Sequence, residues 1–405
     1  MHTTGGIAHP DLAAARAILP DVIELRRRLH RIPEVGLELP KTQAIVLDAV
    51  RALGLEPMAG VSVGSVVATI EGAGQGPTIL LRADMDGLPL TEETGLDFAS
   101  EHDGRMHACG HDTHVAMLLG ASRILVEERA TWPGRVLLMF QPGEEGFHGA
   151  RYMLDEGLLD RSGGERPSGA LALHISTLYE TGTIDVRPGP MLASGDTLRI
   201  TVRGRGGHAS APHTAVDPIA VAAELVLALQ MMVTRRVDAF DPAVITIAQV
   251  IAGTTTNIIP ETAFLGGTMR TVSEARRAAV RDGIRQVCAG IAAAHGATIE
   301  VEIEAGYPVT VNDDAFSELI LSVAGEVLGE ENARLLSAPI MGSEDFSYVL
   351  QQVPGAMAFV GARPAEVDPA TAPMNHSNRV VFDESAMAAG IATYVAVAKR
   401  HLSGA

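Results

Sequence analysis

The stretch PTILLRADMD, residues 77–86, joins a short, continuously apolar run to a pair of aspartates. RVLLMF at 135–140 and ALALH at 170–174 are runs of the same kind. A helical pattern at 112–129 separates the first run from the second. Buried strands that alternate with helices predict an α/β domain with a largely parallel central sheet covered on both faces. The other elements predicted for this domain are helices at 11–32, 40–53, 314–328 and 383–401 and a strand at 356–361.

The pattern changes near residue 194. DTLRITVRG at 196–204 alternates like a half-exposed strand. Two helices and three further strands follow, at 217–237, 243–253, 262–271, 273–296 and 297–305. This β-α-β-β-α-β order indicates one four-stranded sheet with two helices on one face. The sequence therefore predicts an inserted α+β domain at 194–306 and a discontinuous larger domain made of 1–193 and 307–405.

Composition excludes several classes of protein. The 405 residues include 49 acidic and 31 basic side chains, for a formal net charge of −18. This charge argues against partners such as nucleic acids and anionic membrane surfaces. No uninterrupted apolar run approaches the ~18 residues of a membrane-spanning helix. Two cysteines, Cys109 and Cys288, are too few for a disulfide framework, so a cytoplasmic location is expected.

Ligand-type side chains follow the apolar runs. Asp84 and Asp86 come after the first run, and the pair Glu144-Glu145 comes after the second. His174 ends the third run, and His376 follows the last strand after a loop. Ligands of open α/β sheets bind beyond the carboxyl ends of the strands, so these side chains predict one convergent site.

The stretch HACGHDTH at 107–114 is the strongest candidate for metal binding. We expect the helix to begin after Gly110 with Asp112 as its N-cap, so that Cys109 and His111 point the same way from a loop. A thiolate and an imidazole placed in this way form a natural metal clamp. A buried cysteine beside hydrogen-bonded histidines is the alternative.

The adjacent glutamates, Glu144 and Glu145, predict two different roles for their carboxylates. After a Pro-Gly turn, one carboxylate can bind metal while the other faces water, as metal-assisted hydrolysis requires. A solvated acidic loop is the alternative. Asp84 and Asp86 either orient ligating imidazoles or cap the turn after their strand.

Seven motifs together resemble a known family. They are LLRADMDGLPL (80–90), MHACGHDTH (106–114), MFQPGEEG (139–146), GRGGHASAPH (204–213), TTTNIIPETAFLGGTMRT (254–271), MGSEDFS (341–347) and MNHSN (374–378). The chain is similar to the binuclear-metal amidohydrolases, which include hippurate hydrolase, N-acyl-amino-acid aminoacylases and auxin-conjugate hydrolases. The resemblance implies a zinc-peptidase-like catalytic domain with an inserted ferredoxin-like lid.

The resemblance also implies residue roles. The ligands of two divalent ions, zinc or manganese, would be Cys109, His111, Glu145, His174 and His376. Glu144 would be the general base and Asp86 an orienting carboxylate. Related glutamate carboxypeptidases suggest that His208 polarises the substrate carbonyl and that Asn257 and Arg270 bind substrate. Phe147 and His148 depart from the small residues usual in relatives.

The activity implied is hydrolysis of a small N-acyl-L-amino acid to a carboxylic acid and a free amino acid, and a homodimer formed through the lid is the expected assembly. A dipeptidase or carboxypeptidase of the same superfamily is the nearest alternative. A metal-free thiol hydrolase using Cys109, with His107 or His111, is a second, and a non-catalytic metal-binding protein is a third.

Overall fold

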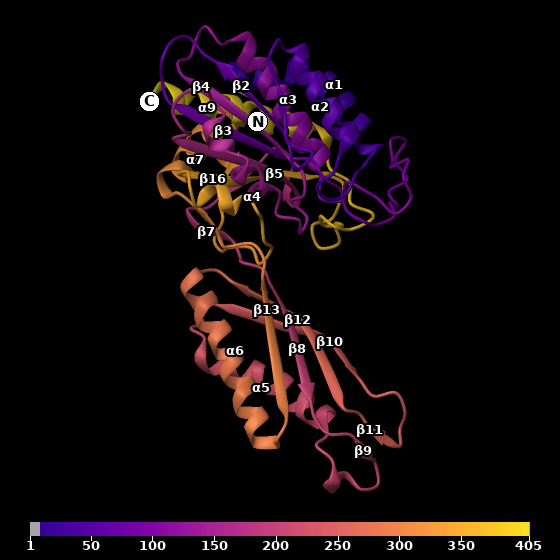
Figure 1. Ribbon diagram of the computed structural model, residues 1–405. Coiled ribbons are helices and arrows are strands. Elements are labelled where there is room, and N and C mark those ends of the chain that lie inside the picture. Colours follow the sequence, from indigo (N-terminus) through magenta and orange to yellow (C-terminus); the bar gives the residue numbers. More distant parts are fainter. Residues whose placement is uncertain (1–8, 405) are drawn as a thin grey trace. The chain divides into compact units, whose positions relative to one another are not determined.

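The computed structural model describes residues 9–404, so residues 1–8 and 405 of the predicted larger domain lie outside it. The chain forms two compact units, and Figure 1 labels the helices and strands of each. The larger unit runs up to Gly189 and includes Val311–Ala338 and the chain from Tyr348 on. The smaller unit comprises Pro190–Thr310 and Pro339–Ser347. The predicted assignment of 194–306 as a lid or dimerisation domain stays a prediction.

The larger unit is built on an eight-stranded sheet in the order β1-β2-β4-β3-β5-β16-β6-β15. Its four middle strands, β4, β3, β5 and β16, run parallel, whereas β2 and β6 pair antiparallel with this group. This arrangement confirms the predicted mixed α/β fold with a largely parallel sheet. The strand bounds are β1 Met58–Ala59, β2 Val66–Glu71, β3 Thr78–Asp84, β4 Arg135–Gln141, β5 Gly169–Glu180, β6 Ile184–Val186, β15 Ala333–Leu335 and β16 Gly355–Arg363.

Every residue of β3 is buried, and β4 and β16 are buried except at one end, because helices cover the sheet. Three helices, α1, α3 and α9, pack against one another, and α3 and α9 also contact β3. The helices of this unit are α1 Pro10–His30, α2 Pro40–Ala52, α3 His111–Glu127, α4 Gly149–Asp155, α7 Asp314–Leu328, α8 Ser347–Leu350 and α9 Met387–Ser403.

The smaller unit has the predicted β-α-β-β-α-β order. Its four-stranded antiparallel sheet runs β10-β12-β8-β13, and α5 and α6 lie together on one side of it (Figure 1). The two helices begin where their caps predict, at Asp217 and Ser273, whose side chains accept backbone N–H groups. The bounds are β8 Asp196–Arg203, α5 Pro218–Arg236, β10 Ala243–Ala252, β12 Thr262–Thr271, α6 Glu274–His295 and β13 Thr298–Ala305. Shorter strands are β7 Gly189–Leu192, β9 Gly207–His208, β11 Ile258–Ile259 and β14 Thr310–Asn312.

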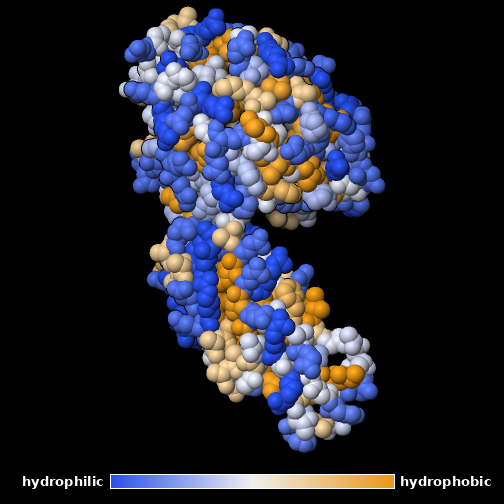
Figure 2. All heavy atoms as spheres, viewed as in Figure 1, coloured by the Kyte–Doolittle hydropathy of each residue, from blue (hydrophilic) through white to orange (hydrophobic). Residues whose placement is uncertain are grey.

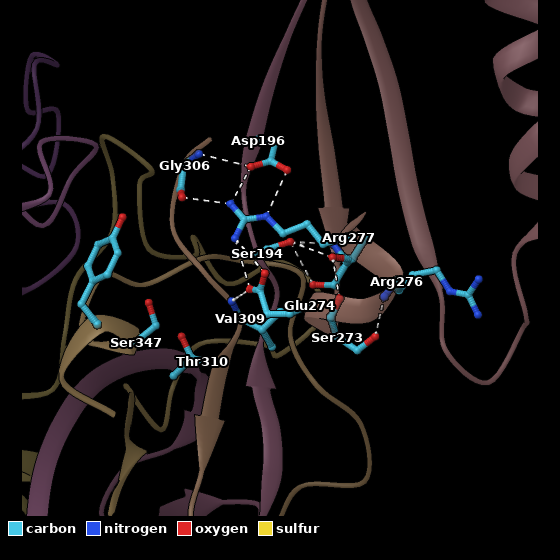
Figure 3. Close-up of polar contacts among 12 residues, drawn as sticks. Ser194, Asp196, Ser273, Glu274, Arg276, Arg277, Gly306, Val309, Thr310 and Ser347 are labelled. Carbon is cyan, nitrogen blue, oxygen red and sulfur yellow. Dashed lines mark hydrogen bonds and ion pairs between the residues drawn. The ribbon is translucent and has the colours of Figure 1, made fainter. Parts of the chain in front are cut away.

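A buried ionic cluster joins the first residues of this sheet to α6 (Figure 3). The guanidinium of Arg277 donates to both oxygens of Asp196, at 2.6 and 3.1 Å. Arg281 makes a second forked pair with the same carboxylate. Arg277 also donates to the carbonyl of Gly306 at 3.0 Å. A Cβ at Gly306 would come within 1.8 Å of the Gly195 carbonyl oxygen, so only glycine fits this crossing of two chain segments.

Within residues 9–404, one helix, α5, is long and apolar enough to cross a membrane by length and composition alone. Its buried residues, among them Val221, Leu225 and Leu229, pack in the core of the smaller unit with residues of β8 and β12. A core helix of a compact unit passes the same test of length and composition.

Candidate metal centre

Cys109 and His111 lie at the start of α3. The helix begins at His111 with Gly110 as its N-cap in the left-handed conformation, φ 83°, so the predicted N-cap Asp112 is wrong. The carboxylate of Asp112 is engaged elsewhere, since it accepts hydrogen bonds from Arg26 Nε at 2.7 Å and from His30 Nδ1 at 2.8 Å. Two buried side chains from α1 therefore hold the carboxylate that was expected to cap the helix.

Three predicted ligands meet around one sulfur atom. The Sγ atom of Cys109 lies 3.4 Å from Nε2 of His174 and 3.3 Å from Nε2 of His376. His174 donates its other nitrogen, Nδ1, to the carbonyl of Ile175 at 2.8 Å, which leaves Nε2 unprotonated and able to bind a metal. The residue lies within β5 and not at the strand's end, just beyond the last residue pair, Arg82–Ala172, that β5 forms with β3.

His376 has an unusual backbone. Its φ of 71° is in the left-handed region, which a non-glycine residue adopts only at a cost. Its N–H donates to the Ala108 carbonyl at 2.9 Å, which joins this loop to the segment that carries Cys109. The ring reaches Glu145, with Nε2 3.1 Å from Oε1. Strain of this kind is typical of functional sites.

The glutamate pair is positioned by Asp86. Its Oδ1 accepts the N–H of Glu144 at 3.0 Å, and its Oδ2 accepts the N–H of Glu145 at 3.1 Å. The same Oδ1 lies 3.5 Å from Nδ1 of His111. Asp86 is 1% exposed and Glu144 6% exposed, so the two backbone hydrogen bonds are shielded from water. The carboxylate therefore faces an imidazole, one of the two roles that the sequence suggested, and its backbone hydrogen bonds go to the turn after β4 and not to the turn after its own strand.

The residues present fit a metal. His111 is fully buried, and neither ring nitrogen makes a hydrogen bond within residues 9–404. Ligand atoms lie within 4.8 Å of one another in two groups that share Cys109, and a third group adds Glu144. Sulfur, imidazole and carboxylate donors of this kind suit zinc, and the last two also suit manganese. The three groups are Cys109-His111-His174, Cys109-Glu145-His376 and His111-Glu144-Glu145, and the described residues form two more groups, Asp84-His111-His114 and Glu144-Glu344-Asp345.

His114 was part of the quoted motif but received no role, and its hydrogen bonds exclude it as a ligand. Nδ1 donates to Asp84 at 2.5 Å, and Nε2 accepts the N–H of Ile175 at 2.8 Å. Both nitrogens are therefore occupied, although His114 lies close to His111 and Asp84. Burial would raise the pKa of Asp84, but Arg82 and the imidazoles of His111 and His114 hold it well below its usual range. The signal available in the sequence was the i, i+3 spacing from His111 on a helix.

The substrate-binding residues carried over from relatives lie apart within the smaller unit. His208 in β9 pairs with Ile258 of β11, next to Asn257, and the Asn257 carbonyl accepts the N–H of Ala209 at 3.1 Å. Arg270 lies near the other end of β12, eight residues beyond Thr262, or roughly 25 Å at the rise of a strand. The structure brings His208 and Asn257 together but not Arg270, so one copy of this unit does not present all three to one small substrate.

Comparison with known proteins identifies the family of this chain. A family model described as peptidase family M20/M25/M40 matches residues 80–400. The chain is 37% identical over 381 residues to thermostable carboxypeptidase 1 of Saccharolobus solfataricus, covering 93% of this chain and 94% of that protein. It is 36% identical to the N-acetyl-L-cysteine deacetylase of Bacillus subtilis, covering 84% and 80%. The crystal structure of a dinuclear metal-binding M20 peptidase from Bacillus subtilis superposes with a TM-score of 0.80 at 32% identity, covering 96% of this chain and 99% of that one. The chain belongs to peptidase family M20/M25/M40.

Proposed function

We propose that this enzyme hydrolyses the amide bond of N-acyl-L-amino acids and uses two divalent metal ions. The observation that carries the proposal is the convergence of four donors, His111, His174, Glu145 and His376, around the sulfur of Cys109, with the carboxylate of Glu144 beside them. The deacetylase relative acts on an acetylated amino acid by its name, and its similarity covers most of both chains. Two divalent ions, when bound, polarise an amide carbonyl and lower the pKa of water.

The donors divide into two sets. His111 and His174 would hold one ion, and Glu145 and His376 would hold the other, because these pairs form the two groups that contain Cys109. The thiolate of Cys109 would then serve both ions. Carboxylate and imidazole donors accept either zinc or manganese. Which metal occupies the site therefore depends on the metals available in the cell as well as on the donors.

Glu144 is the proposed general base. Its carboxylate belongs to the group with His111 and Glu145, and its backbone is held by Asp86. It would take a proton from the attacking water and pass it to the leaving nitrogen. Asp86 keeps the neighbouring carboxylates of Glu144 and Glu145 in place by binding both of their N–H groups.

The substrate carboxylate is assigned to Arg270. This half-buried guanidinium donates to the Ser343 hydroxyl at 2.8 Å, and no carboxylate pairs with it among the described residues. Burial lowers the pKa of Arg270, which reflects the cost of holding an unpaired charge away from water. A carboxylate ligand would offset that cost through a forked pair. His208 is assigned to the substrate carbonyl.

The thiol-hydrolase alternative is disfavoured by the surroundings of Cys109. A nucleophilic cysteine needs a lowered pKa, supplied by nearby positive charge. Here burial raises the pKa of Cys109 well above its ordinary value, and the carboxylates of Glu145, Glu144 and Asp84 raise it further. A chelator separates the two reactions, since a thiol enzyme would keep its activity when metal is removed.

A homodimer through the smaller unit is part of the proposal. Strand β10 is at the edge of its sheet, and its exposed side chains include Val244, Val250 and Ile251. The adjacent helix α5 exposes Leu227 and Met231, 72% and 61% accessible, and Figure 2 shows hydrophobic residues on the surface of this unit. An unpaired apolar edge strand is a template for pairing with a second copy.

The separation of His208 from Arg270 supports a dimer on chemical grounds. In a dimer, one copy could contribute His208 and the other Arg270 to the same substrate. Mixing Glu144→Gln with His208→Ala and exchanging subunits should then restore part of the activity that each variant lacks alone. Light scattering tests the assembly itself, and a monomer near 42.5 kDa would contradict it. A cytoplasmic location is proposed on the two cysteines, both free and buried.

The decisive functional experiment is a substrate screen. Purified enzyme would be assayed with acetyl, benzoyl and aminoacyl derivatives of the same amino acid. Turnover of the acetyl or benzoyl compound supports the proposal, whereas exclusive turnover of the aminoacyl compound would identify a dipeptidase. The ring of Phe147, two residues after Glu145, packs against Gly36, 3.5 Å from the position of a Cβ there.

A further inference from the structure

A single side-chain amide joins the three chain segments that carry Cys109, His174 and His376. The Nδ2 group of Asn375 donates to the Cys109 carbonyl at 3.1 Å and to the Ile175 carbonyl at 3.0 Å. Its Oδ1 faces the N–H of Thr177 at 3.4 Å. The next residue in the chain is His376. We infer that Asn375 is a positioning residue that assembles these three ligands before metal arrives, an inference that rests on the proposed metal site.

The orientation of the amide follows from its neighbours. The two carbonyl oxygens can only accept and the N–H of Thr177 can only donate, so the amide nitrogen must face Cys109 and Ile175 and Oδ1 must face Thr177. Aspartate has the same shape but cannot donate to either carbonyl. Alanine removes all three contacts. The site therefore requires an amide and not merely a polar side chain of this size.

The peptide group of Ile175 takes part in three of the hydrogen bonds around the site. Its carbonyl accepts both from Asn375 and from Nδ1 of His174, and that second bond determines which nitrogen of His174 binds metal. Its N–H donates to His114. A shift of this peptide would therefore move the imidazole of His174 relative to the sulfur of Cys109, which lies 3.4 Å away.

The same amide supports the strained backbone of His376. The positive φ of His376 is maintained by its N–H bond to Ala108 and, one residue earlier, by the bonds of Asn375 to Cys109 and Ile175. Without the amide, one tie to the Cys109 segment remains, and relaxation of the loop would turn the ring away from Cys109. Partners that orient ligands in this way typically contribute about 10- to 100-fold to metal affinity.

The test measures metal binding to the purified full-length apoprotein, without substrate. Asn375→Asp and Asn375→Ala should weaken zinc binding about 10- to 100-fold in competition with a chromogenic chelator. The melting temperature of each apoprotein is measured alongside. A purely structural role would lower the apoprotein melting temperature without a specific loss of affinity, whereas positioning lowers affinity in variants whose apoprotein remains folded.

Thr177→Val is the matched control. It removes the bond from Thr177 Oγ1 to the Pro373 carbonyl, 2.9 Å, which ties the same loop to the same strand but reaches neither Cys109 nor Ile175. Its zinc affinity should stay within about threefold of wild type, well short of the tenfold lower bound for an orienting partner. Equal losses in Thr177→Val and Asn375→Asp would overturn the inference, as would wild-type affinity in Asn375→Asp. Failure of wild type to bind zinc or manganese would overturn the proposed function as well, so the two failures are distinguishable.

Discussion

Replacing Asp86 by asparagine tests how the glutamate pair is held. The carboxylate accepts the N–H groups of Glu144 and Glu145 with its two oxygens, at 3.0 and 3.1 Å. Asparagine keeps one acceptor and turns its NH2 group toward the other N–H, so a buried donor loses its partner. A hydrogen bond to a charged group contributes about 1.5–3 kcal/mol, and each 1.36 kcal/mol is tenfold, so kcat/KM should fall roughly 10- to 150-fold.

The assay is hydrolysis of an N-acetyl-L-amino acid, with rates divided by the metal content from elemental analysis. This correction matters because Asp86 also faces His111 at 3.5 Å. Asp368→Asn is the control, since this exposed carboxylate also accepts a backbone N–H, that of Ala370 at 2.9 Å. A metal-corrected rate for Asp86→Asn within twofold of wild type would refute the assignment of Asp86 as the support of the pair.

Three further predictions concern single side chains. Iodoacetamide should label Cys109 slowly in the metal-loaded enzyme and faster after chelation, because coordination ties up the thiolate; equal rates would contradict ligation. His208→Ala should lower kcat/KM about 10²-fold or more with metal content unchanged, on the scale of a lost oxyanion donor, and wild-type kinetics would make His208 structural. Arg277→Ala should destabilise the enzyme by roughly 3 kcal/mol in denaturant titrations, the scale for a broken buried ion pair. Arg277 and Arg281 overcome the effect of burial and hold the pKa of Asp196 below its usual value. The stability that this carboxylate contributes is therefore present above its unfolded pKa of about 3.9 and is lost as pH falls toward the folded value. An Arg277→Ala deficit that persists undiminished at the acid end of this range would contradict that reasoning.

Much of the fold was predictable because its signals are local. The runs at 77–82, 135–140 and 170–174 are mostly apolar, and they lie in strands that are almost wholly buried there. Asp217 and Ser273 cap their helices through bonds to N–H groups two or three residues away. Signals of this range can be read from a single sequence, and the residue order then determines the sheet of the smaller unit.

The errors and omissions have non-local causes. Asp112 has the chemistry of an N-cap, but Arg26 and His30, more than eighty residues earlier, bind its carboxylate. Asn375 is an ordinary loop asparagine in the sequence, because its partners at Cys109 and Ile175 lie at least 200 positions away. His208 and Arg270 were grouped by resemblance, although the length of β12, already predicted from the sequence, separates them. In each case the deciding information is which distant segments become neighbours.

The most direct test of the central claim compares Glu144→Gln with Glu145→Gln by turnover and elemental analysis. The account assigns the first glutamate to proton transfer and the second to metal binding. Glu144→Gln should therefore retain metal while kcat falls at least ~10²-fold, the scale of general acid–base catalysis. Glu145→Gln should lose metal, because one ion loses a carboxylate ligand. Near-wild-type turnover in Glu144→Gln, or loss of metal from that variant alone, would contradict the account.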